Sequence, residues 1–310
     1  MIAPGLGTVQ LGLPYGNAKN KELMPEEDAS AILDTALKLG IRFFDTAHGY
    51  GKSEDRIGRS QSAHKTPDLV VSSKIPVFTK EVWLSPKALQ DVVFKSAKES
   101  LTRLNLKTFD LLQFHQCDLD FLQSPSTAGV MANLIDQGIC SSVGVSVYNL
   151  EQAGAALEIP AVSALQIPIN LLDRRFAQEK WLKKFGDRKV RLIARSIFLQ
   201  GVLVDQAELP QVRKTPELKI LKSLALSTAQ RLEQSLSTLA LRYIFGNLKD
   251  DLSIGLLGTD SVQSLQENIE RLKGGPHGRL EPLSSEELKA FTEAENFSIK
   301  NGLYNPATWD

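Results

Sequence analysis

The sequence is poor in cysteine, and this scarcity excludes several kinds of site. Its 310 residues include two cysteines, Cys117 and Cys140. One pair cannot build the disulfide framework of a small secreted protein, and two unlinked thiols are typical of a reducing cytosol. Their spacing matches no zinc motif. We therefore expect a cytoplasmic protein without a disulfide scaffold or a cysteine-bound metal.

The chain also lacks an excess of charge of one sign and any long apolar run. Lysine and arginine total 36, aspartate and glutamate total 36, and the net charge is therefore zero. A nucleic-acid binder held by phosphate contacts would carry a basic excess. No apolar run approaches the roughly 20 residues of a membrane span, and the first residues lack the basic segment of a secretory signal. These absences argue against nucleic-acid and membrane partners.

The chain does contain a series of short apolar runs, each of strand length. They are rich in Val, Ile, Leu or Phe and lie too far apart for hairpins, as expected of strands that are buried on both faces. The runs are GLGTVQL (5–11), IRFFDTA (41–47), LVVSSKI (69–75), FDLLQFH (109–115), SSVGVSV (141–147), ALQIPIN (164–170), RLIARSIF (191–198) and SIGLLG (253–258).

Helical patterns lie between most of these runs. Pro25 is followed by three acidic residues and an apolar stripe, and Gly40 ends that pattern. One helix between two strands is what a parallel crossover requires. Helices are also predicted over 85–105, 151–157, 173–185, 237–245, 261–272 and 284–294, with a loop leading into a helix over 204–230.

Alternating strands and helices predict a (β/α)8 TIM barrel that forms a single domain over residues 1–310. The main rival is a doubly wound parallel sheet, which would carry a GxGxxG turn after its first strand. Gly5-Leu6-Gly7 is followed by Gln10 where that fingerprint needs its third glycine. The barrel is therefore the favoured fold.

Barrel enzymes place their chemistry at the carboxyl ends of the strands. The second run ends at Asp45, with Tyr50 five residues further on. The third run ends near Lys74 and the fourth at His115. Each residue alone has an ordinary structural explanation, such as a turn, a solvated strand end or loop packing. Together they indicate one polar site at one end of the barrel.

These four side chains can share one chemical task. A phenol has a pKa of about 10 and donates protons poorly at neutral pH. We expect the Lys74 ammonium to lower the pKa of Tyr50, and Asp45 to pair with Lys74 and orient it. Tyr50 would then protonate a carbonyl oxygen, which His115 would polarise with a hydrogen bond.

The string FFDTAHGYGKSEDRIG (43–58) resembles the D-T-A-x-x-Y-G-x-S-E motif of aldo-keto reductases. This resemblance implies a barrel that reduces carbonyl compounds with NAD(P)H, with Asp45, Tyr50, Lys74 and His115 as its catalytic tetrad. Hydride must come from such a cofactor, because no side chain can donate one. The likeness covers essentially the whole chain and continues in SSK (72–74), LLQFH (111–115), GVS (144–146), ALQIPIN (164–170), GTDSVQSLQEN (258–268) and LYNPATW (303–309).

The candidate phosphate site follows the eighth apolar run. Gly258, Thr259, Asp260 and Ser261 open a helix there, and the backbone N–H groups of a helix start favour anions. An ordinary N-cap by Asp260 or Ser261 would explain the same residues. The resemblance implies that Ser146 and Gln166 hold the nicotinamide carboxamide. It assigns further cofactor contacts to Gly7, Thr8, Ser196, Leu199, Gly201, Gln263, Glu267 and Asn268.

Two positions depart from the pattern of many relatives. Val147 stands where many have an asparagine after the serine of GVS. Arg195 stands where many stack a tyrosine on the nicotinamide, although a guanidinium can also stack on a planar ring.

The form of the nucleotide is a separate question. Selectivity for NADP(H) usually needs a basic residue beside the 2′-phosphate. Residues 259–265 contain none. The resemblance to the family favours NADP(H), whereas the lack of a basic residue over 259–265 is also compatible with NAD(H).

The substrate is expected to be a small carbonyl compound bound by loops after the strands. His48, Trp83 and Gln116 are the candidate contacts. A metal-dependent barrel enzyme is one alternative, but it would need converging ligands, and only His48 and His115 could meet near Asp45. A second alternative is a regulatory or redox-sensing subunit that binds nicotinamide nucleotide with little turnover.

Overall fold

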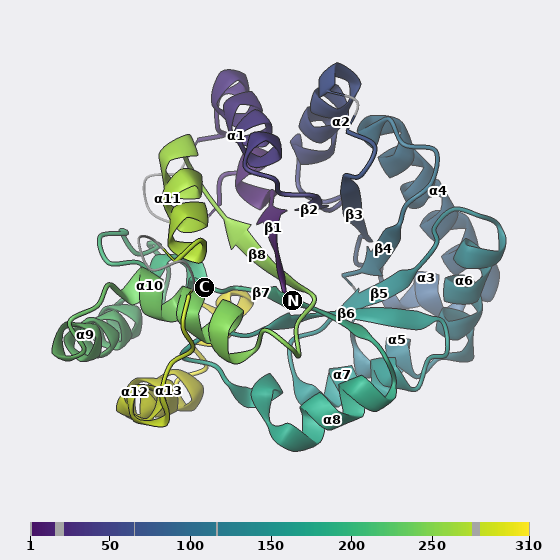
Figure 1. Cartoon of the computed structure of the whole chain (residues 1–310). Helices are drawn as coiled ribbons and strands as arrows, with labels where there is room; N and C mark the ends of the chain where they lie inside the picture. The colour runs from purple at the N-terminus through teal and green to yellow at the C-terminus, as the bar shows by residue number, and fades with distance from the viewer. Residues whose placement is uncertain (1, 16–21, 65, 116, 275–279, 310) are drawn as a thin grey trace.

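The computed structural model describes residues 2–15, 22–64, 66–115, 117–274 and 280–309. Eight parallel strands form a closed barrel in sequence order, with the helices around it (Figure 1). This confirms the predicted (β/α)8 fold. The strands are β1 (Ala3–Gly7), β2 (Phe43–Asp45), β3 (Val70–Ile75), β4 (Leu111–Phe114), β5 (Val143–Ser146), β6 (Val162–Pro168), β7 (Arg191–Arg195) and β8 (Ile254–Gly258).

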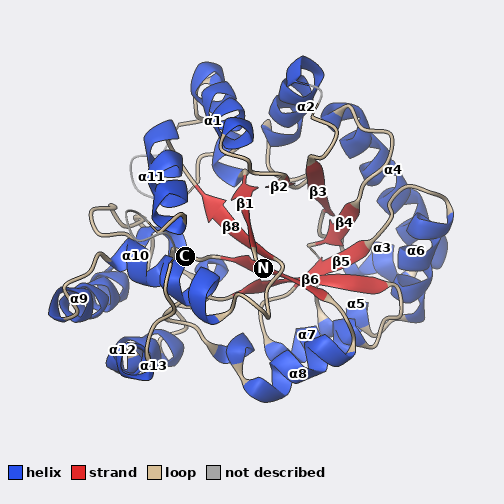
Figure 2. Ribbon diagram, in the orientation of Figure 1, coloured by secondary structure: helices blue, strands red, loops and turns tan. Residues whose placement is uncertain are grey.

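The helices form an outer ring around the strands (Figure 2). No helix in the described part of the chain is long and apolar enough to cross a membrane. The helices are α1 (Glu26–Lys38), α2 (Ser53–His64), α3 (Lys80–Leu84), α4 (Pro86–Leu104), α5 (Leu119–Leu122), α6 (Pro125–Asp136), α7 (Leu150–Leu157), α8 (Glu179–Asp187), α9 (Thr215–Arg231), α10 (Leu236–Leu241), α11 (Val262–Leu272), α12 (Ser285–Ala290) and α13 (Thr292–Lys300).

Several predicted helices differ from the observed ones. The helix predicted over 173–185 begins only at Glu179, because Asp173 closes a backbone turn with Asn170 and its carboxylate binds Arg175. The pattern over 237–245 is α10 followed by a π-helical turn, Arg242–Asn247. The pattern over 284–294 is divided between α12 and α13.

The barrel interior changes from apolar to polar along the strands. A cluster of apolar side chains contains one residue from each of five strands: Phe43, Leu111, Ala164, Ile193 and Leu256. Toward the carboxyl ends of the strands the buried side chains include Asp45, Lys74 and Gln166. The strand register pairs Asp45 with Gly7 at the end of β1, and it pairs Lys74 with Gln113 near the end of β4. Asp45 and Lys74 therefore lie at the same end of the barrel.

Candidate active site

The four residues of the predicted tetrad meet at the carboxyl end of the barrel. Asp45 is the last residue of β2, Lys74 lies one residue before the end of β3, and His115 directly follows β4. Tyr50 lies in the loop between β2 and α2. The site therefore combines three strand ends with one loop residue.

Asp45 and Lys74 form a buried ion pair. The Lys74 ammonium lies 2.6 Å from Asp45 Oδ2 and also donates to the Thr46 carbonyl oxygen at 3.0 Å. The other carboxylate oxygen accepts from the Gln166 amide at 2.8 Å and from the Gln113 amide at 3.2 Å. A buried charge pair is costly unless its remaining hydrogen-bonding positions are filled, and these amides fill them.

Tyr50 lies between Lys74 and His115. The Lys74 Nζ atom is 5.2 Å from the centre of the phenol ring, and the ring centres of Tyr50 and His115 are 5.6 Å apart. The Tyr50 loop passes directly over Gly12, where an added Cβ atom would lie 1.8 Å from the Tyr50 carbonyl oxygen. Only glycine at position 12 permits this approach, so the packing of the loop positions the tyrosine.

The protonation of the site differs from the sequence prediction. Burial raises the pKa of Tyr50 well above its ordinary value, and the Asp45 carboxylate raises it further. The pKa of Tyr50 is therefore raised where the sequence predicted a lowered one, because burial and Asp45 outweigh the effect expected of Lys74. Asp45 neutralises the lysine, whose own pKa is lowered by burial against the opposing effect of that carboxylate. The phenol thus keeps its proton firmly.

His115 is a neutral imidazole. Burial lowers its pKa to about 3, and the charges of Lys74 and Arg195 act in the same direction. A neutral imidazole carries one N–H group and can donate one hydrogen bond. It can therefore polarise a carbonyl oxygen without adding a full positive charge to the site.

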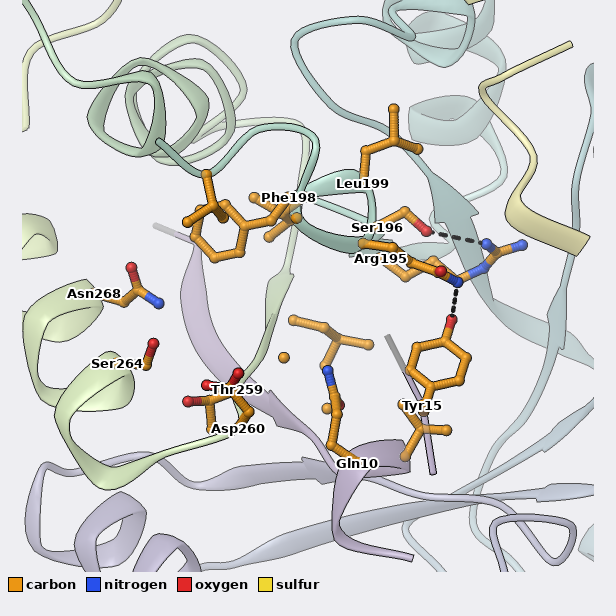
Figure 3. Close-up of a pocket in the computed structure, with 18 of the residues that line it drawn as sticks. Gln10, Tyr15, Arg195, Ser196, Phe198, Leu199, Thr259, Asp260, Ser264 and Asn268 are labelled. Atoms are coloured by element: carbon orange, nitrogen blue, oxygen red, sulfur yellow. Dashed lines mark hydrogen bonds between the residues drawn. The ribbon is translucent and has the colours of Figure 1, made fainter. Parts of the chain in front are cut away.

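A cavity of about 820 Å³ extends from the tetrad to the start of α11. Tyr50 and His115 line one end, together with Arg195 and Tyr15. Figure 3 shows Arg195 and Tyr15 across the cavity from Ser264 and Asn268. The predicted cofactor residues that line it are Gly7, Thr8, Ser146, Gln166, Arg195, Ser196, Leu199, Gly201, Gly258, Thr259, Glu267 and Asn268.

Two predicted cofactor residues lie outside the cavity lining. Ser261 caps α11, with its hydroxyl accepting from the Ser264 N–H at 3.1 Å. Gln263 donates to Glu267 at 2.9 Å along the same helix. The N-cap explanation therefore describes the observed contacts of Ser261, while the neighbouring Gly258 and Thr259 form the cavity wall.

The Arg195 end of the cavity is built from aromatic and amide groups. The guanidinium lies 4.4 Å from the centre of the Tyr148 ring and donates to the Val147 carbonyl oxygen at 3.0 Å. Nearby, Gln200 donates to the Tyr15 hydroxyl at 2.8 Å, which joins the segment after β7 to the loop after β1.

Sequence reasoning missed several cavity residues. Tyr148 directly follows Val147, two residues after the end of β5, so its position in the sequence was a usable signal. Arg271 lies beyond the helix start at 259–265 where a basic residue was expected; it is one helical turn after Asn268 and lines the cavity. The other residues missed include Gln10, Tyr15, Phe198 and Asp205.

Of the three predicted substrate contacts, the two described ones, His48 and Trp83, do not line the cavity. Trp83 is buried and packs edge-on against Phe121, with ring centres 6.0 Å apart. His48 faces α4, where its Nε2 atom is 3.1 Å from Glu99. Gln116 lies outside the described residues.

The family model of the aldo/keto reductase family matches residues 5–295. This chain belongs to the aldo/keto reductase family. It is therefore an oxidoreductase of a family that reduces small carbonyl compounds with a nicotinamide cofactor.

Individual relatives are distant but cover most of the chain. L-galactose dehydrogenase of Arabidopsis thaliana is 26% identical, over 97% of this chain and 94% of its own length. L-glyceraldehyde 3-phosphate reductase of Escherichia coli is 27% identical, over 79% of each chain. A holo aldo-keto reductase structure from Bacillus halodurans has a TM-score of 0.70 at 22% identity, covering 94% of this chain and 91% of that one.

The cavity of this aldo/keto reductase suits a nicotinamide nucleotide. It holds two buried polar atoms without a hydrogen-bond partner among the described residues, Gln10 Oε1 and Arg195 Nε. Its far end meets the first turn of α11, where backbone N–H groups favour phosphate. A dinucleotide needs this extended shape, with the reactive ring at the tetrad and anions at a helix start.

Proposed function

We propose that this protein reduces an aldehyde or ketone to an alcohol, using hydride from NAD(P)H and a proton from Tyr50. The observation that carries the proposal is the placement of Tyr50 and His115 at one end of a cavity whose other end is a helix start. Reduction of a carbonyl needs hydride and proton to arrive at adjacent atoms. An elongated cavity with a proton donor at one end provides for both.

Before the reaction, the phenol of Tyr50 is protonated. Burial and the Asp45 carboxylate raise the pKa of the phenol, so it remains protonated before reaction. A carbonyl oxygen gains negative charge as hydride reaches its carbon, and it then becomes a stronger base than the phenolate. The Lys74 ammonium, 5.2 Å from the phenol ring centre, stabilises the phenolate that proton transfer leaves.

The other tetrad residues bind and orient. His115 donates a hydrogen bond to the carbonyl oxygen, because its lowered pKa keeps it neutral. Asp45 fixes Lys74 through the 2.6 Å contact, and the Gln166 and Gln113 amides fix Asp45. We assign Ser146 and Gln166 to the carboxamide of the nicotinamide, since both line the cavity at this end.

We assign NADP(H) as the preferred nucleotide, with Arg271 as the residue that meets the 2′-phosphate. Arg271 is the one cation that lines the α11 end of the cavity among the described residues. It donates to Asn268 at 3.3 Å and lies 3.4 Å from Glu267, so its guanidinium is oriented along the cavity wall. The Asp260 carboxylate on the same wall repels a phosphate and acts against this preference.

The test is NADPH and NADH oxidation across a panel of aldehydes, ketones and sugars, with Tyr50→Phe beside the unaltered protein. We expect turnover of at least one carbonyl class and a loss of kcat of at least about a hundredfold in Tyr50→Phe, because the phenylalanine keeps the ring but not the proton. Reduction that survives this substitution refutes Tyr50 as the proton donor. Tight nucleotide binding without turnover of any carbonyl favours the regulatory alternative.

A further inference from the structure

Arg195 is an unusual group to find at the reactive end of this cavity. It is partly buried at the end of β7 and lines the cavity with Tyr50 and His115. Its guanidinium donates to the Val147 carbonyl oxygen and to Ser196 Oγ, and its Nε atom has no partner among the described residues. No carboxylate of the described chain forms an ion pair with it. The charge is thus held by neutral groups alone.

The charges around Arg195 leave this end of the cavity positive. Asp45 and Lys74 cancel each other at 2.6 Å. His115 is neutral because burial holds its pKa at about 3, and Tyr50 is neutral because burial raises its pKa. Four further acidic residues line the cavity, Asp205 and Glu208 after β7 and Asp260 and Glu267 at the α11 end. Asp205 accepts from the Leu236 N–H and the Ser237 hydroxyl at the start of α10, and none of the four forms an ion pair with Arg195 in the described chain. Arg195 is therefore the uncompensated charge beside the tetrad.

The influence of this charge already reaches the catalytic groups. Burial is the main cause of the shifted pKa values of Tyr50, Lys74 and His115, and the Arg195 guanidinium acts on all three in the direction of a lower pKa. A lower pKa means that added positive charge is disfavoured at each of these positions. Any other group that gains positive charge in the same space is subject to the same repulsion.

A nicotinamide ring is such a group. In carbonyl reduction a hydride, which carries two electrons, leaves the neutral dihydronicotinamide and forms the new C–H bond. The carbonyl π electrons take the proton from Tyr50, and the ring is left with one positive charge. Because the hydride must reach a carbon whose oxygen contacts Tyr50 and His115, the ring must lie at the Arg195 end of the cavity.

We infer that Arg195 makes this protein select the reduced over the oxidised nicotinamide nucleotide, so that the bound couple favours carbonyl reduction. The inference rests on the proposed function for the position of the ring, and it extends that function to the direction of reaction. Reduced and oxidised nucleotides share their phosphates and adenosine, so those contacts cancel in a comparison of the two. The difference in binding free energy that remains comes from the repulsion between the positive charge of the oxidised ring and the Arg195 guanidinium.

The test measures dissociation constants by isothermal titration calorimetry without carbonyl substrate. The probes are NADPH and NADP⁺, and separately NADH and NAD⁺, with the intact protein. We expect the reduced form to bind more tightly. Arg195→Met should lower the ratio of oxidised to reduced dissociation constants by about tenfold or more, the scale of one partly screened charge at close range. Arg195→Lys should largely keep the ratio.

Two further variants make the comparison specific. Lys219→Met removes an exposed positive charge on α9, outside the cavity lining, and should leave the ratio unchanged. Arg195→Gln is a second neutral variant that keeps an N–H donor for the Val147 carbonyl oxygen, and it decides the matter if Arg195→Met does not fold. A neutral variant with the ratio of the unaltered protein overturns the inference.

Failure of the inference can be told from failure of the proposed function. If the ratio of oxidised to reduced dissociation constants is the same in the unaltered protein and the neutral variants, while carbonyl reduction still depends on Tyr50, only the role of Arg195 is overturned. This is the result expected if the arginine solely holds an anionic substrate. Absence of binding by all four nucleotides overturns the proposed function and the inference with it.

Discussion

The Gln166 side chain on β6 donates to Asp45 Oδ1 on β2 at 2.8 Å, across the buried carboxyl end of the barrel. Lys74 binds the other oxygen of the same carboxylate at 2.6 Å. Asp45 therefore joins a residue expected to touch the cofactor to a residue that supports the proton donor. Its charge matters for folding as well as for chemistry, and the two effects can be separated.

Removing the Asp45 charge should destabilise the fold through Lys74. Asp45→Asn leaves a buried ammonium without its counter-ion, which costs about 3–5 kcal/mol. The double variant Asp45→Asn/Lys74→Met removes both charges and should regain part of this loss, although both proteins should be poor catalysts. Urea unfolding measures the stability. A double variant less stable than Asp45→Asn would contradict this account of the pair.

Acid should destabilise the protein through His115. Its native pKa is about 3, while an unfolded histidine titrates near about 6.5. Between these values the unfolded chain binds more protons than the native one, so stability falls as the pH falls. This single group contributes at most about 1.4 kcal/mol per pH unit in that window.

His115→Asn should therefore flatten the acid side of the stability profile. Urea midpoints measured from pH 7 to pH 4 should fall less steeply for His115→Asn than for the unaltered protein. The carboxylates are common to both proteins, so the difference between the two profiles isolates the histidine. Parallel profiles would show that His115 titrates normally.

The Tyr50 loop should depend on Gly12 and not on Gly49. An alanine Cβ at position 12 would lie 1.8 Å from the Tyr50 carbonyl oxygen, whereas one at position 49 would meet nothing within 4 Å. Gly12→Ala should displace the tyrosine and lower kcat/KM by about tenfold or more, since small misplacements of a catalytic group are costly. Gly49→Ala, in the same loop, should stay close to the unaltered protein. Equal effects of the two substitutions would refute the packing argument.

The preference for NADP(H) should respond in opposite directions to two residues. Arg271→Met removes the cation at the α11 end and should reduce the ratio of kcat/KM for NADPH to that for NADH by about tenfold. Asp260→Asn removes a carboxylate from the same wall and should raise that ratio. A clear preference of the unaltered protein for NADH would overturn the assignment of NADP(H).

The barrel could be predicted because each strand is a short apolar run that needs no information from elsewhere in the chain. Helices were harder. α2 (Ser53–His64) is mainly polar, and it packs against α4 through Gly58, where an added Cβ would lie 2.0 Å from the Arg103 carbonyl oxygen. Such a helix is stabilised by close contact with its neighbour and carries little apolar periodicity of its own.

The sequence by itself determined the fold class and the family, and it predicted the tetrad residues, because these depend on local patterns and on motifs within single segments. The tertiary structure alone decided that Trp83 is packed away from the cavity, that Arg271 reaches it, and that the pKa of Tyr50 is raised. It also decided that Arg195 is uncompensated beside the tetrad. Burial and local charge depend on which distant segments pack together, and no single segment carries that information.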